Sequence, residues 1–453
     1  MSRRTGVITR TFALHWARAL PGARFGFAPR ATRRAAFARA TRLALEELGP
    51  AFVKLGQVAS VRPDLVPPEY VFEFEQLQDR VLPLPASEIE AVICRELGRP
   101  LSELFDDFER EPVAAASIAQ VHRATLVREV RPVIGEVMPA GTPVAVKVVR
   151  PRAAGVIEAD LAEARRVLGR LDRLGLSRRI DAPALLEEFA ASLASELDLR
   201  NEGRVSDRFA HDFRDDPFVM TPRIAWTHCS RSVLTMEYVE GWRLTEIDDA
   251  ARAGVDAFHL AVHGAEVFMR QVLVLGRYHA DLHPANLFVT PDSRICYLDF
   301  GIVGTTEPAE RINIAQVLAA TVYGDADRAL CYSAELGLVV PPHKQREVRE
   351  RVGELMDRTL NVPGRPADIK GFATGFLSVM ADARVPIPAG YGLLVKALVT
   401  VEGVARAIYP EIDITKSAKP FATRLIAAHM ARPDRIAERL PAALRAALRE
   451  LAS

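Results

Sequence analysis

Two aspartates and one asparagine with chemically useful side chains stand close together in the second half of the sequence. The stretch from His279 to Asn286 reads His-Ala-Asp-Leu-His-Pro-Ala-Asn, and Leu-Asp-Phe-Gly follows at 298–301. The carboxylate of Asp299 and the amide oxygen of Asn286 are hard oxygen ligands, which Mg²⁺ prefers. Asp281 can accept the proton of an attacking hydroxyl group or orient a water molecule. These residue types predict a site that handles metal-chelated phosphate.

The spacing of these residues carries more weight than any one of them. Asp-Phe-Gly alone is often a turn, and Asp or Asn in a loop usually bonds to the backbone. A loop ending in Asp-x-x-x-x-Asn, followed by two short strands and Asp-Phe-Gly, is how kinases arrange phosphoryl transfer. Here apolar strands are expected at 287–290 and 295–298. We interpret Asp281 as catalytic and Asn286 and Asp299 as metal ligands, with the preceding histidine buttressing the loop.

A lysine on an apolar strand is the second chemical candidate. Lys147 follows Val-Ala-Val in a β-branched run, where burying its ammonium group is costly unless that group finds a partner. Phosphate oxygens and a carboxylate from a helix would supply such a partner. An edge-strand lysine that reaches water is the alternative, and in isolation it would be favoured. The pattern around Asp281 and Asp299 favours the functional interpretation.

The carboxylate partner is expected in a helix over 184–213, which contains Glu-Leu-Asp-Leu-Arg-Asn-Glu at 196–202. Glu196 and Glu202 are six positions apart. In a continuous helix they would lie on different faces and could not both point at one ion. Surface helices commonly carry such charges. Fewer observations therefore support the assignment of this carboxylate partner than support those of Lys147, Asp281 and Asp299.

An alanine-rich segment stands where a kinase would place Gly-x-Gly-x-x-Gly. It consists of Ala114, Ala115, Ala116 and Ser117. Glycine lets the backbone approach and wrap phosphates, whereas the Cβ of alanine restricts both. We expect this loop to border the nucleotide, and its composition argues against ordinary protein-kinase activity.

The elements that must position these residues follow from periodicity and turn signals. Apolar residues recur at three- and four-residue steps over 41–104, and Pro, Gly and short β-branched runs mark strands at 118–126, 144–149 and 233–239. Helical patterns cover 157–213, 256–275 and most of the chain from 307. We predict an α+β, two-lobed, protein-kinase-like fold with a helical N-terminal extension. The expected segments are a basic arm (1–45), a helical extension (46–108), an N-lobe (109–241), a C-lobe (242–420) and an amphipathic helical tail (421–453).

Composition excludes several classes of protein. About half of the 453 residues are hydrophobic and a quarter are charged, which predicts a sizeable core, and a net charge of +1 gives no reason to expect nucleic acid as a partner. The four cysteines are scattered, so we expect neither a disulfide framework nor a zinc site. The most apolar segments, 267–275 and 389–401, are short or carry a charge such as Arg270 or Lys396. We expect no membrane span and no secretory signal, and a cytoplasmic location.

The two ends of the chain are basic. Several arginines and no acidic residue precede Glu46, and 426–451 has a basic, amphipathic helical pattern. The N-terminal arm is interpreted either as a peripheral contact with anionic membrane or as a solvated, poorly ordered tail. The residues leave both alternatives open.

From about Glu46 to Thr415, the chain resembles the UbiB family of atypical kinase-like proteins, the AarF/ADCK group. Besides the kinase-like motifs, the resemblance rests on Lys-Leu-Gly-Gln at 54–57, Arg-Pro-Asp-Leu-Val-Pro-Pro-Glu-Tyr at 62–70, the alanine loop, Glu-x-Asp at 196–198 and Val-Glu-Gly-Val-Ala-Arg at 401–406. The chain departs from the family pattern at Gly203, Val205 and Ala285, and its tail lacks the membrane span that some members carry.

The resemblance implies roles for further residues. Lys54 and Gln57 lie on a helical extension over the active site, and Lys54 pairs with Glu196 or Asp198. Glu202 is the partner of Lys147. The segment from Met236, with Glu237 and Tyr238, lines the adenine pocket.

The resemblance also implies ATP or ADP with Mg²⁺ as cofactors and a role as an ATPase or small-molecule kinase in isoprenoid-lipid metabolism, notably ubiquinone biosynthesis. A lipid or prenyl-quinone precursor would then be a partner. Two alternatives stay open. One is a nucleotide-binding pseudokinase scaffold without turnover. The other is a soluble small-molecule kinase, which gives no reason for the segment 54–57.

Overall fold

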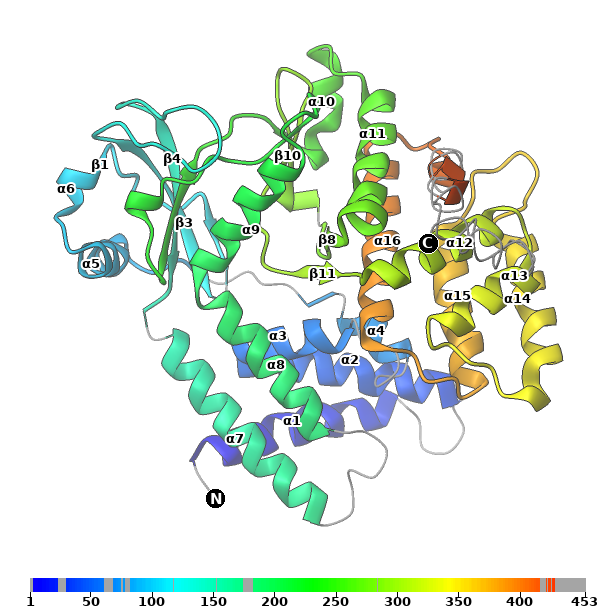
Figure 1. The fold of residues 1–453 in the computed structure, drawn as a ribbon. Helices are drawn as coiled ribbons and strands as arrows, with labels where there is room; N and C mark the ends of the chain where they lie inside the picture. Colours follow the sequence, from blue (N-terminus) through cyan, green and yellow to red (C-terminus); the bar gives the residue numbers. More distant parts are fainter. Residues whose placement is uncertain are drawn as a thin grey trace, which may run out of the picture. The chain divides into compact units, whose positions relative to one another are not determined.

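The computed structural model divides the chain into two compact units. The first consists of Met1–Gly241 and Asn286–Gly301, and the second of Trp242–Ala285 and Ile302–Ser453. The structure describes residues 3–22, 30–60, 68–74, 76–77, 82–116, 118–151, 153–173, 182–282, 284–415, 421, 423–424 and 426–427. The expectations for 62–67, for Ser117 and for most of the tail therefore lie outside the described residues. Helices and strands are both present, as an α+β fold requires (Figure 1).

The first unit contains most of the strands. Its helices are α1 (Arg3–Gly22), α2 (Arg30–Leu48), α3 (Pro50–Ser60), α4 (Pro68–Phe74), α5 (Ala86–Leu97), α6 (Leu101–Leu104), α7 (Ala153–Arg173), α8 (Ala182–Glu196), α9 (Leu199–Asp212) and η1 (Trp226–His228). Its strands are β1 (Phe105–Asp106), β2 (Ala114–Ala115), β3 (Ala119–Leu126), β4 (Pro143–Val149), β5 (Val219–Met220), β6 (Val233–Glu237), β9 (Leu287–Val289) and β10 (Ile295–Tyr297). The short helix η4 (Pro284–Asn286) spans the junction with the second unit.

An antiparallel sheet forms the centre of the first unit. The strand order is β1-β3-β4-β6, and β2 pairs with β3. In register, Lys147 of β4 lies between Val121 of β3 and Leu234 of β6. Side chains alternate between the two faces of a strand. Val144, Val146 and Val148 therefore share one face of β4, and Lys147 belongs to the other face.

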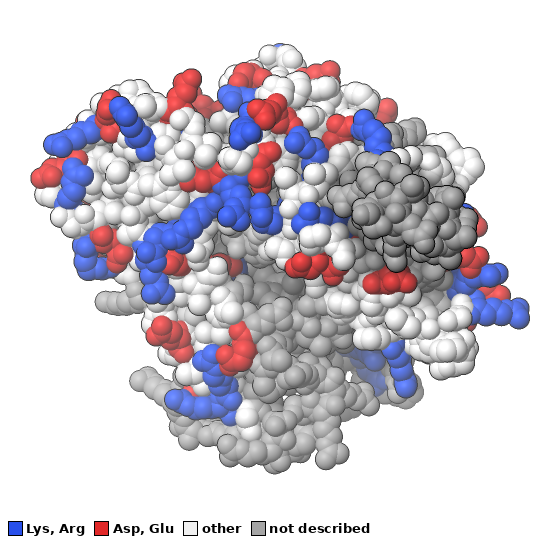
Figure 2. Space-filling model, in the orientation of Figure 1, with Lys and Arg blue, Asp and Glu red and all other residues white. Residues whose placement is uncertain are grey.

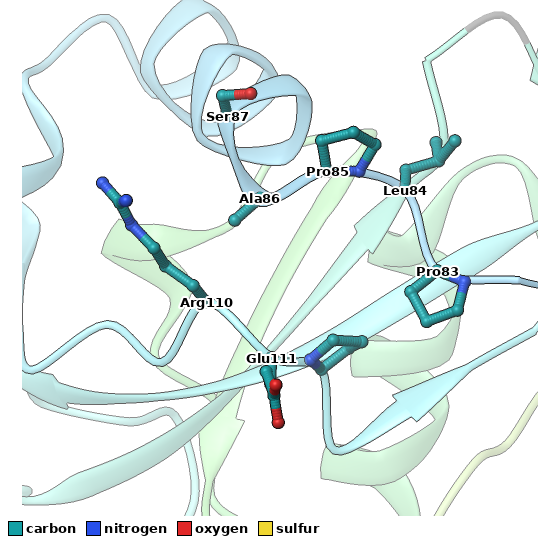
Figure 3. Close-up of a pocket in the computed structure, with 8 residues that line it drawn as sticks. Pro83, Leu84, Pro85, Ala86, Ser87, Arg110 and Glu111 are labelled. Atoms are coloured by element: carbon teal, nitrogen blue, oxygen red, sulfur yellow. The ribbon is translucent and has the colours of Figure 1, made fainter.

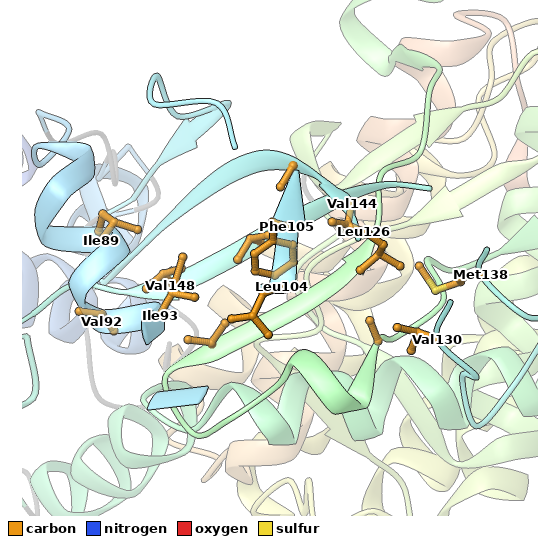
Figure 4. Packing of buried hydrophobic residues seen from close by; sticks show 14 residues of the cluster. Ile89, Val92, Ile93, Leu104, Phe105, Leu126, Val130, Met138, Val144 and Val148 are labelled. Carbon is orange, nitrogen blue, oxygen red and sulfur yellow. The ribbon is translucent and has the colours of Figure 1, made fainter. Parts of the chain in front are cut away.

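Each face of the sheet has its own apolar core. The valines of β4 pack with Ile89, Ile93 and Leu104 from α5 and α6 on one side (Figure 4). On the opposite side, Ile157, Leu161, Phe189 and Leu193 of α7 and α8 pack with residues from α9 and the sheet. Burial of each such side chain contributes on the order of 1.5–3 kcal/mol. The two cores hold β4 in place. Lys147 lies on the face that α7 and α8 cover.

The N-terminal residues form a helical layer of the first unit. Helix α1 packs against α2, and α2 packs against α3 and α4. Trp16 donates a hydrogen bond to Thr41 (3.1 Å), and His15 lies 2.8 Å from the carboxylate of Glu47. A poorly ordered tail, one of the two alternatives for this arm, is therefore wrong for 3–22 and 30–48. Apolar side chains of α1–α4 share a core that includes Phe52, as the helical spacing predicts.

The second unit is mostly helical. Its elements are β7 (Trp242–Arg243), η2 (Leu244–Glu246), α10 (Ile247–Arg252), α11 (Ala257–Arg270), η3 (Gln271–Leu275), β8 (Arg277–His279), β11 (Val303–Thr305), α12 (Pro308–Val322), α13 (Ala326–Glu335), η5 (Pro342–Lys344), α14 (Gln345–Thr359), α15 (Ile369–Asp382) and α16 (Ala389–Ile408). Helices α12–α15 contribute to one core, and α16 packs against α11 and α15. Strands β8 and β11 pair antiparallel, with His279 opposite Val303.

Charged side chains of both signs are interspersed over much of the face shown in Figure 2. Several ion pairs among the described residues are exposed, such as Arg165 with Glu187 at 2.7 Å. Such pairs contribute little to stability because water and salt screen them. Within the described residues, no helix is both long enough and apolar enough to cross a membrane.

Candidate phosphate-handling site

Lys147 is at the centre of the site in the first unit. Its Nζ donates to both carboxylate oxygens of Glu202, each at 2.8 Å, and lies 3.4 Å from Oδ1 of Asp299. The side chains of Lys147 and Glu202 are 16% and 10% exposed. The structure therefore excludes an edge-strand lysine that reaches water. It also brings together the strand lysine, the helix carboxylate and the aspartate of Asp-Phe-Gly, three of the residues singled out in the sequence.

Glu202 reaches Lys147 because the predicted helix over 184–213 is broken. Helix α8 ends at Glu196, and α9 begins at Leu199 with Asp198 as its N-cap, which accepts from the backbone N–H of Arg200 (3.2 Å). The prediction that Glu196 and Glu202 lie on different faces of one continuous helix is wrong. Asp is a favoured N-cap residue, and it was the local signal for this break.

Gly203 explains how closely α9 approaches the sheet. A Cβ at this position would lie 3.0 Å from Leu234 of β6 and 3.0 Å from the ring of Trp226. That separation is tighter than ordinary van der Waals contact. Gly203 therefore lets the N-terminal part of α9 lie against the strand next to Lys147.

Glu196 has a separate partner. Its carboxylate lies 2.9 Å from Nζ of Lys54 on α3, and both side chains are largely buried. Asp198 instead pairs with Arg200 at 2.6 Å. Of the two partners implied for Lys54, the structure places Glu196 in contact. Gln57 donates to the carbonyl of Leu77 (3.4 Å), within the same layer of helices.

Gly56 shows why the segment 54–57 needs a glycine. A Cβ there would lie 2.2 Å from Leu77 and 2.9 Å from Leu45. The glycine lets α3 pack closely on its neighbours. It thereby fixes the helix that presents Lys54 to Glu196.

Three carboxylates share two ammonium groups in this part of the first unit. They are Glu196, Glu202 and Asp299, with Lys54 and Lys147. Burial raises the pKa of Glu202 to about 7, although Lys147 opposes the shift. Burial also raises the pKa of Glu196, against the attraction of Lys54. Burial alone would lower the pKa of Lys147, but Asp299 and Glu202 outweigh it and hold that pKa above its ordinary value.

The excess of carboxylates makes the group receptive to a cation. Because negative charges outnumber positive ones, proton uptake or an added cation relieves their repulsion. Asp299 is the most open of the three, with its side chain 47% exposed. It is the carboxylate best placed to exchange partners.

The backbone joins the two predicted metal ligands. The N–H of Leu298 donates to the carbonyl of Asn286 (2.9 Å), which places Asn286 beside the residue that precedes Asp299. Asp299 has φ +50°, a left-handed conformation that aspartate tolerates better than most residues, and its Oδ1 accepts from Gly301 N–H (3.2 Å). The ring of Phe300 packs on Phe209 of α9, with centroids 5.2 Å apart. Strained, anchored backbone of this kind is concentrated at functional sites.

The alanine loop forms a hairpin with β3. Ala114 pairs with Val121 and Ala115 with Gln120, and the N–H of Ala116 donates to Ala119 (2.9 Å). Ser117, at the turn, lies outside the described residues. Strand β2 and the turn after it come before β3 and β4 in the chain, and β4 carries Lys147. A loop that covers phosphate precedes the strand lysine in the same order in kinases.

The predicted adenine-pocket residues have partners of their own. Glu237 forms an ion pair with Arg223 (2.6 Å), and Tyr238 lies under the guanidinium group of Arg123, 4.7 Å from the ring centroid. The backbone N–H of Tyr238 donates to Pro143 (3.0 Å). These contacts test neither residue's role in nucleotide binding.

A hollow of about 620 Å³ lies in another part of the first unit. It is lined by residues 83–87 and 110–112, at the start of α5 (Figure 3). Pro83, Pro85 and Pro112 give it rigid walls, and neither Lys147 nor Asp299 lines it. It therefore plays no part in the candidate site.

Asp281 belongs to the second unit, on the loop that follows β8. Its backbone N–H donates to Nδ1 of His279 (3.2 Å), and Gln271 Oε1 accepts from the backbone N–H of His279 (2.9 Å). The side chain of His279 is buried, and it buttresses the loop as expected. Convergence of Asp281 with Lys147 and Asp299 stays a prediction, because those two residues belong to the first unit.

Two further residues of the second unit lie next to the loop of Asp281 or begin an unusual helical turn, and the sequence motifs did not identify either as a site residue. Nζ of Lys396 on α16 lies 3.2 Å from Oδ1 of Asp281. Gln271 begins η3, a π-helical turn, and such turns are frequent at functional sites. Lys396 had one signal, namely a lysine within an apolar run of an arginine-rich chain. Gln271 had none.

The chain is similar to known kinase-like proteins. Residues 76–333 match the ABC1 atypical kinase-like domain, and residues 352–413 match the UbiB helical domain. A relative from Marinobacter nauticus, named probable protein kinase UbiB, is 34% identical over 385 residues, which are 84% of this chain and 68% of the relative.

A solved structure, that of Rv3197 from Mycobacterium tuberculosis in complex with erythromycin, aligns with TM-score 0.54 and 25% identity. The alignment covers 84% of this chain and 93% of that one. Together with the domain matches, this likeness confirms the predicted kinase-like α+β fold.

Proposed function

The chain belongs to the ABC1/UbiB family of atypical kinase-like proteins, and from this premise we propose that it is a Mg²⁺-dependent ATPase or phosphotransferase. The observation that carries the proposal is the placement of Lys147, in contact with Glu202 and Asp299 at once. In kinases, a strand lysine paired with a helix glutamate, together with the aspartate of Asp-Phe-Gly, is required for phosphoryl transfer.

Each residue has a defined task in this proposal. Lys147 contacts phosphate oxygens of ATP or ADP, and Glu202 holds its ammonium group in position. Asp299 and Asn286 hold Mg²⁺, which neutralises charge on the phosphates when bound. Asp281 accepts a proton from the attacking hydroxyl group or orients a water molecule.

The donor set suits Mg²⁺ bound mainly through phosphate. Asp299 and Asn286 offer hard oxygen atoms, and the carboxylate of Asp299 is half exposed. Among the described residues, no three His, Cys, Asp or Glu side chains form a metal site made by protein alone. Mg²⁺ commonly takes one or two protein ligands and completes its shell with water and substrate phosphates.

The phosphate acceptor that we propose is water or a small molecule of isoprenoid-lipid metabolism, such as a ubiquinone precursor. The resemblance to the UbiB family motivates this choice. The helix α1 supports a peripheral contact with anionic membrane, because it has several arginines, no acidic residue and exposed Val7 and Leu14. Sedimentation with vesicles containing anionic lipid, compared with neutral vesicles, tests that contact.

A measurement of ATP hydrolysis tests the proposed activity. We expect Mg²⁺-dependent turnover that changes on addition of lipid extract and that Asp299→Asn lowers by at least about 100-fold, since removing a metal ligand removes charge stabilisation. Asp215→Asn is the matched control, because the Asp215 side chain is 91% exposed. Turnover that is independent of Mg²⁺, or is equal in wild type and Asp299→Asn, would contradict the proposal.

A nucleotide-binding scaffold is the second candidate, and the alanine hairpin favours it. The Cβ atoms of Ala114 and Ala115 restrict the backbone where glycine would wrap the phosphates. Nucleotide binding without hydrolysis or transfer, with and without lipid, would support this candidate. A small-molecule kinase of another family ranks lower, since it gives no reason for the buried pair of Lys54 and Glu196.

A further inference from the structure

Asp281 has a cationic neighbour that the sequence motifs do not contain. The ammonium nitrogen of Lys396 lies 3.2 Å from Oδ1 of Asp281, although 115 residues separate them in sequence. The side chains are 24% and 42% exposed, so solvent reaches the pair. Both residues belong to the second unit.

One end of α16 is fixed to the elements next to the loop of Asp281. The hydroxyl group of Tyr278, on β8, donates to the carbonyl of Gly390 (3.5 Å). The hydroxyl group of Tyr391 donates to Glu310 on α12 (3.2 Å). Because β8 leads directly into the loop, these contacts set α16 relative to Asp281.

The other end of α16 is fixed by the segment 401–406. The buried carboxylate of Glu402 accepts from the backbone N–H groups of Ile369 (3.2 Å) and Lys370 (2.7 Å), the first residues of α15. Arg406 bonds to Glu402 and to the carbonyl of Ala367. This pattern, noted in the sequence, has a structural task. It holds the part of α16 that is C-terminal to Lys396 against the start of α15.

The choice of lysine is itself informative. Arginine fills most cationic positions in this chain, and Lys54, Lys147 and Lys396 are three of its few lysines. Each of these three pairs with a carboxylate singled out by the motifs. A partly exposed ion pair adds little to stability because water and salt screen it, so stability alone is a weak reason for this residue.

We propose that Lys396 is a positioning residue for Asp281, holding that carboxylate oriented toward the attacking hydroxyl group or water. The inference rests on the proposed function. In the step itself, the acceptor oxygen bonds to the γ-phosphorus as the bond from that phosphorus to the oxygen of ADP breaks. The acceptor proton passes to Asp281.

Steady-state kinetics of Lys396 variants test this role. We expect Lys396→Met to lower kcat by about 10- to 100-fold, part of the 10²–10⁴-fold that a general base contributes. The KM for MgATP should stay within about twofold, because Lys147 and Asp299 bind the nucleotide. Lys396→Arg should recover part of the lost kcat, since it restores the charge with a different geometry. Lys370→Met, an exposed lysine on α15, is the matched control.

A double-mutant cycle separates positioning from other roles. If Lys396 acts through Asp281, adding Lys396→Met to Asp281→Asn should cause no further loss of kcat. Thermal unfolding and nucleotide affinity are measured for every variant. If Lys396→Met does not fold, Lys396→Gln replaces it, with the same expectation.

The possible results fall into clear groups. Loss of kcat at constant KM, rescue by arginine and a non-additive cycle support the inference. Unchanged kcat in Lys396→Met overturns it, and so do additive losses or a rise in KM alone. Wild type without turnover overturns the proposed function and this inference together, whereas an active wild type with an indifferent Lys396 overturns the inference alone.

Discussion

At the scale of single residues, the site is governed by an imbalance of charge. Lys147 serves two carboxylates, and a third, on Glu196, is close enough to influence the pKa of Glu202. In a buried setting such an imbalance is costly unless a proton or cation offsets it.

The pH dependence of stability reports on this imbalance. Burial raises the pKa of Glu202 from 4.5 to about 7 in the folded chain. Between these values the folded state binds more protons than the unfolded state. The contribution of this group to stability is therefore complete below the unfolded pKa and is lost as pH rises through about 7.

We therefore expect the free energy of unfolding of wild type, relative to Glu202→Gln, to fall as pH is raised from about 5 to about 8. Urea denaturation across this range measures the difference. Glu187→Gln is the control and should show no trend there, because Arg165 lowers the pKa of this exposed glutamate. A flat difference for Glu202→Gln would show that the carboxylate is ionised throughout.

The types of these residues could be predicted from the sequence, but their pairing could not. The strand pattern and Asp-Phe-Gly identified Lys147 and Asp299, because alternation and turn chemistry are local. The contact of Lys396 with Asp281 depends on how α16 packs beside β8, and no local pattern encodes a contact across 115 residues. The choice of Glu202 for Lys147 came from family resemblance, since helical spacing alone left it open.

At the scale of elements, short strands and long helices formed where their sequence patterns predicted them. The break between α8 and α9 was not predicted from the helical pattern. The run 184–213 has continuous helical periodicity, so the break depends on the cap at Asp198 and on the approach of α9 to β6. This break lets Glu196 and Glu202 serve one cluster. The bounds of the five predicted segments stay predictions.

Glycine variants in the β2–β3 hairpin test whether the alanine loop contributes to nucleotide binding. We expect Ala115→Gly and Ala116→Gly to free the backbone and change nucleotide preference or start autophosphorylation, because glycine can wrap phosphates that alanine cannot. Affinities for ATP and ADP, with phosphate incorporation, measure the effect. Ala86→Gly, at the start of α5, is a control for added chain flexibility. Unchanged affinities in both loop variants would count against assigning this hairpin to nucleotide binding.

The β8–β11 pair fixes the loop that carries Asp281, and Gly304 allows its packing. A Cβ at Gly304 would lie 2.2 Å from the ring of Tyr278, which is buried. We expect Gly304→Ala to lower the free energy of unfolding by about 1–3 kcal/mol through overpacking. Gly353→Ala on α14 meets no atom within 4 Å and should be neutral or stabilising by up to about 1 kcal/mol. Equal stability of the two variants in urea denaturation would show that Tyr278 can move.

At the scale of the molecule, the residues proposed for chemistry belong to both compact units. The first contains Lys147, Glu202, Asn286 and Asp299, and the second contains the pair of Asp281 and Lys396. The chain passes between the units inside the motif region, after Ala285 and again after Gly301. Within the first unit, Lys54 connects α3 of the N-terminal helical layer to the carboxylate cluster.

The pair of Lys54 and Glu196 gives a test of that connection. Lys54→Met leaves the buried carboxylate of Glu196 without its cation, and we expect the free energy of unfolding to fall by up to about 3–5 kcal/mol. Removing both charges in Lys54→Met/Glu196→Gln should recover most of the loss, because no ionised group is then left unpaired. Urea denaturation measures stability, and hydrogen exchange of the amides in 50–60 shows whether α3 loosens.

The exposed pair of Arg165 and Glu187 is the matched control, since removing either partner there should cost about 0–1 kcal/mol. If the double variant is no more stable than Lys54→Met, the loss comes from packing and not from the unpaired charge. If exchange in α3 is unchanged in every variant, the N-terminal helices are held by their apolar core alone. Because Glu196 also influences the pKa of Glu202, loosening α3 should alter the pH dependence of the Lys147 cluster as well.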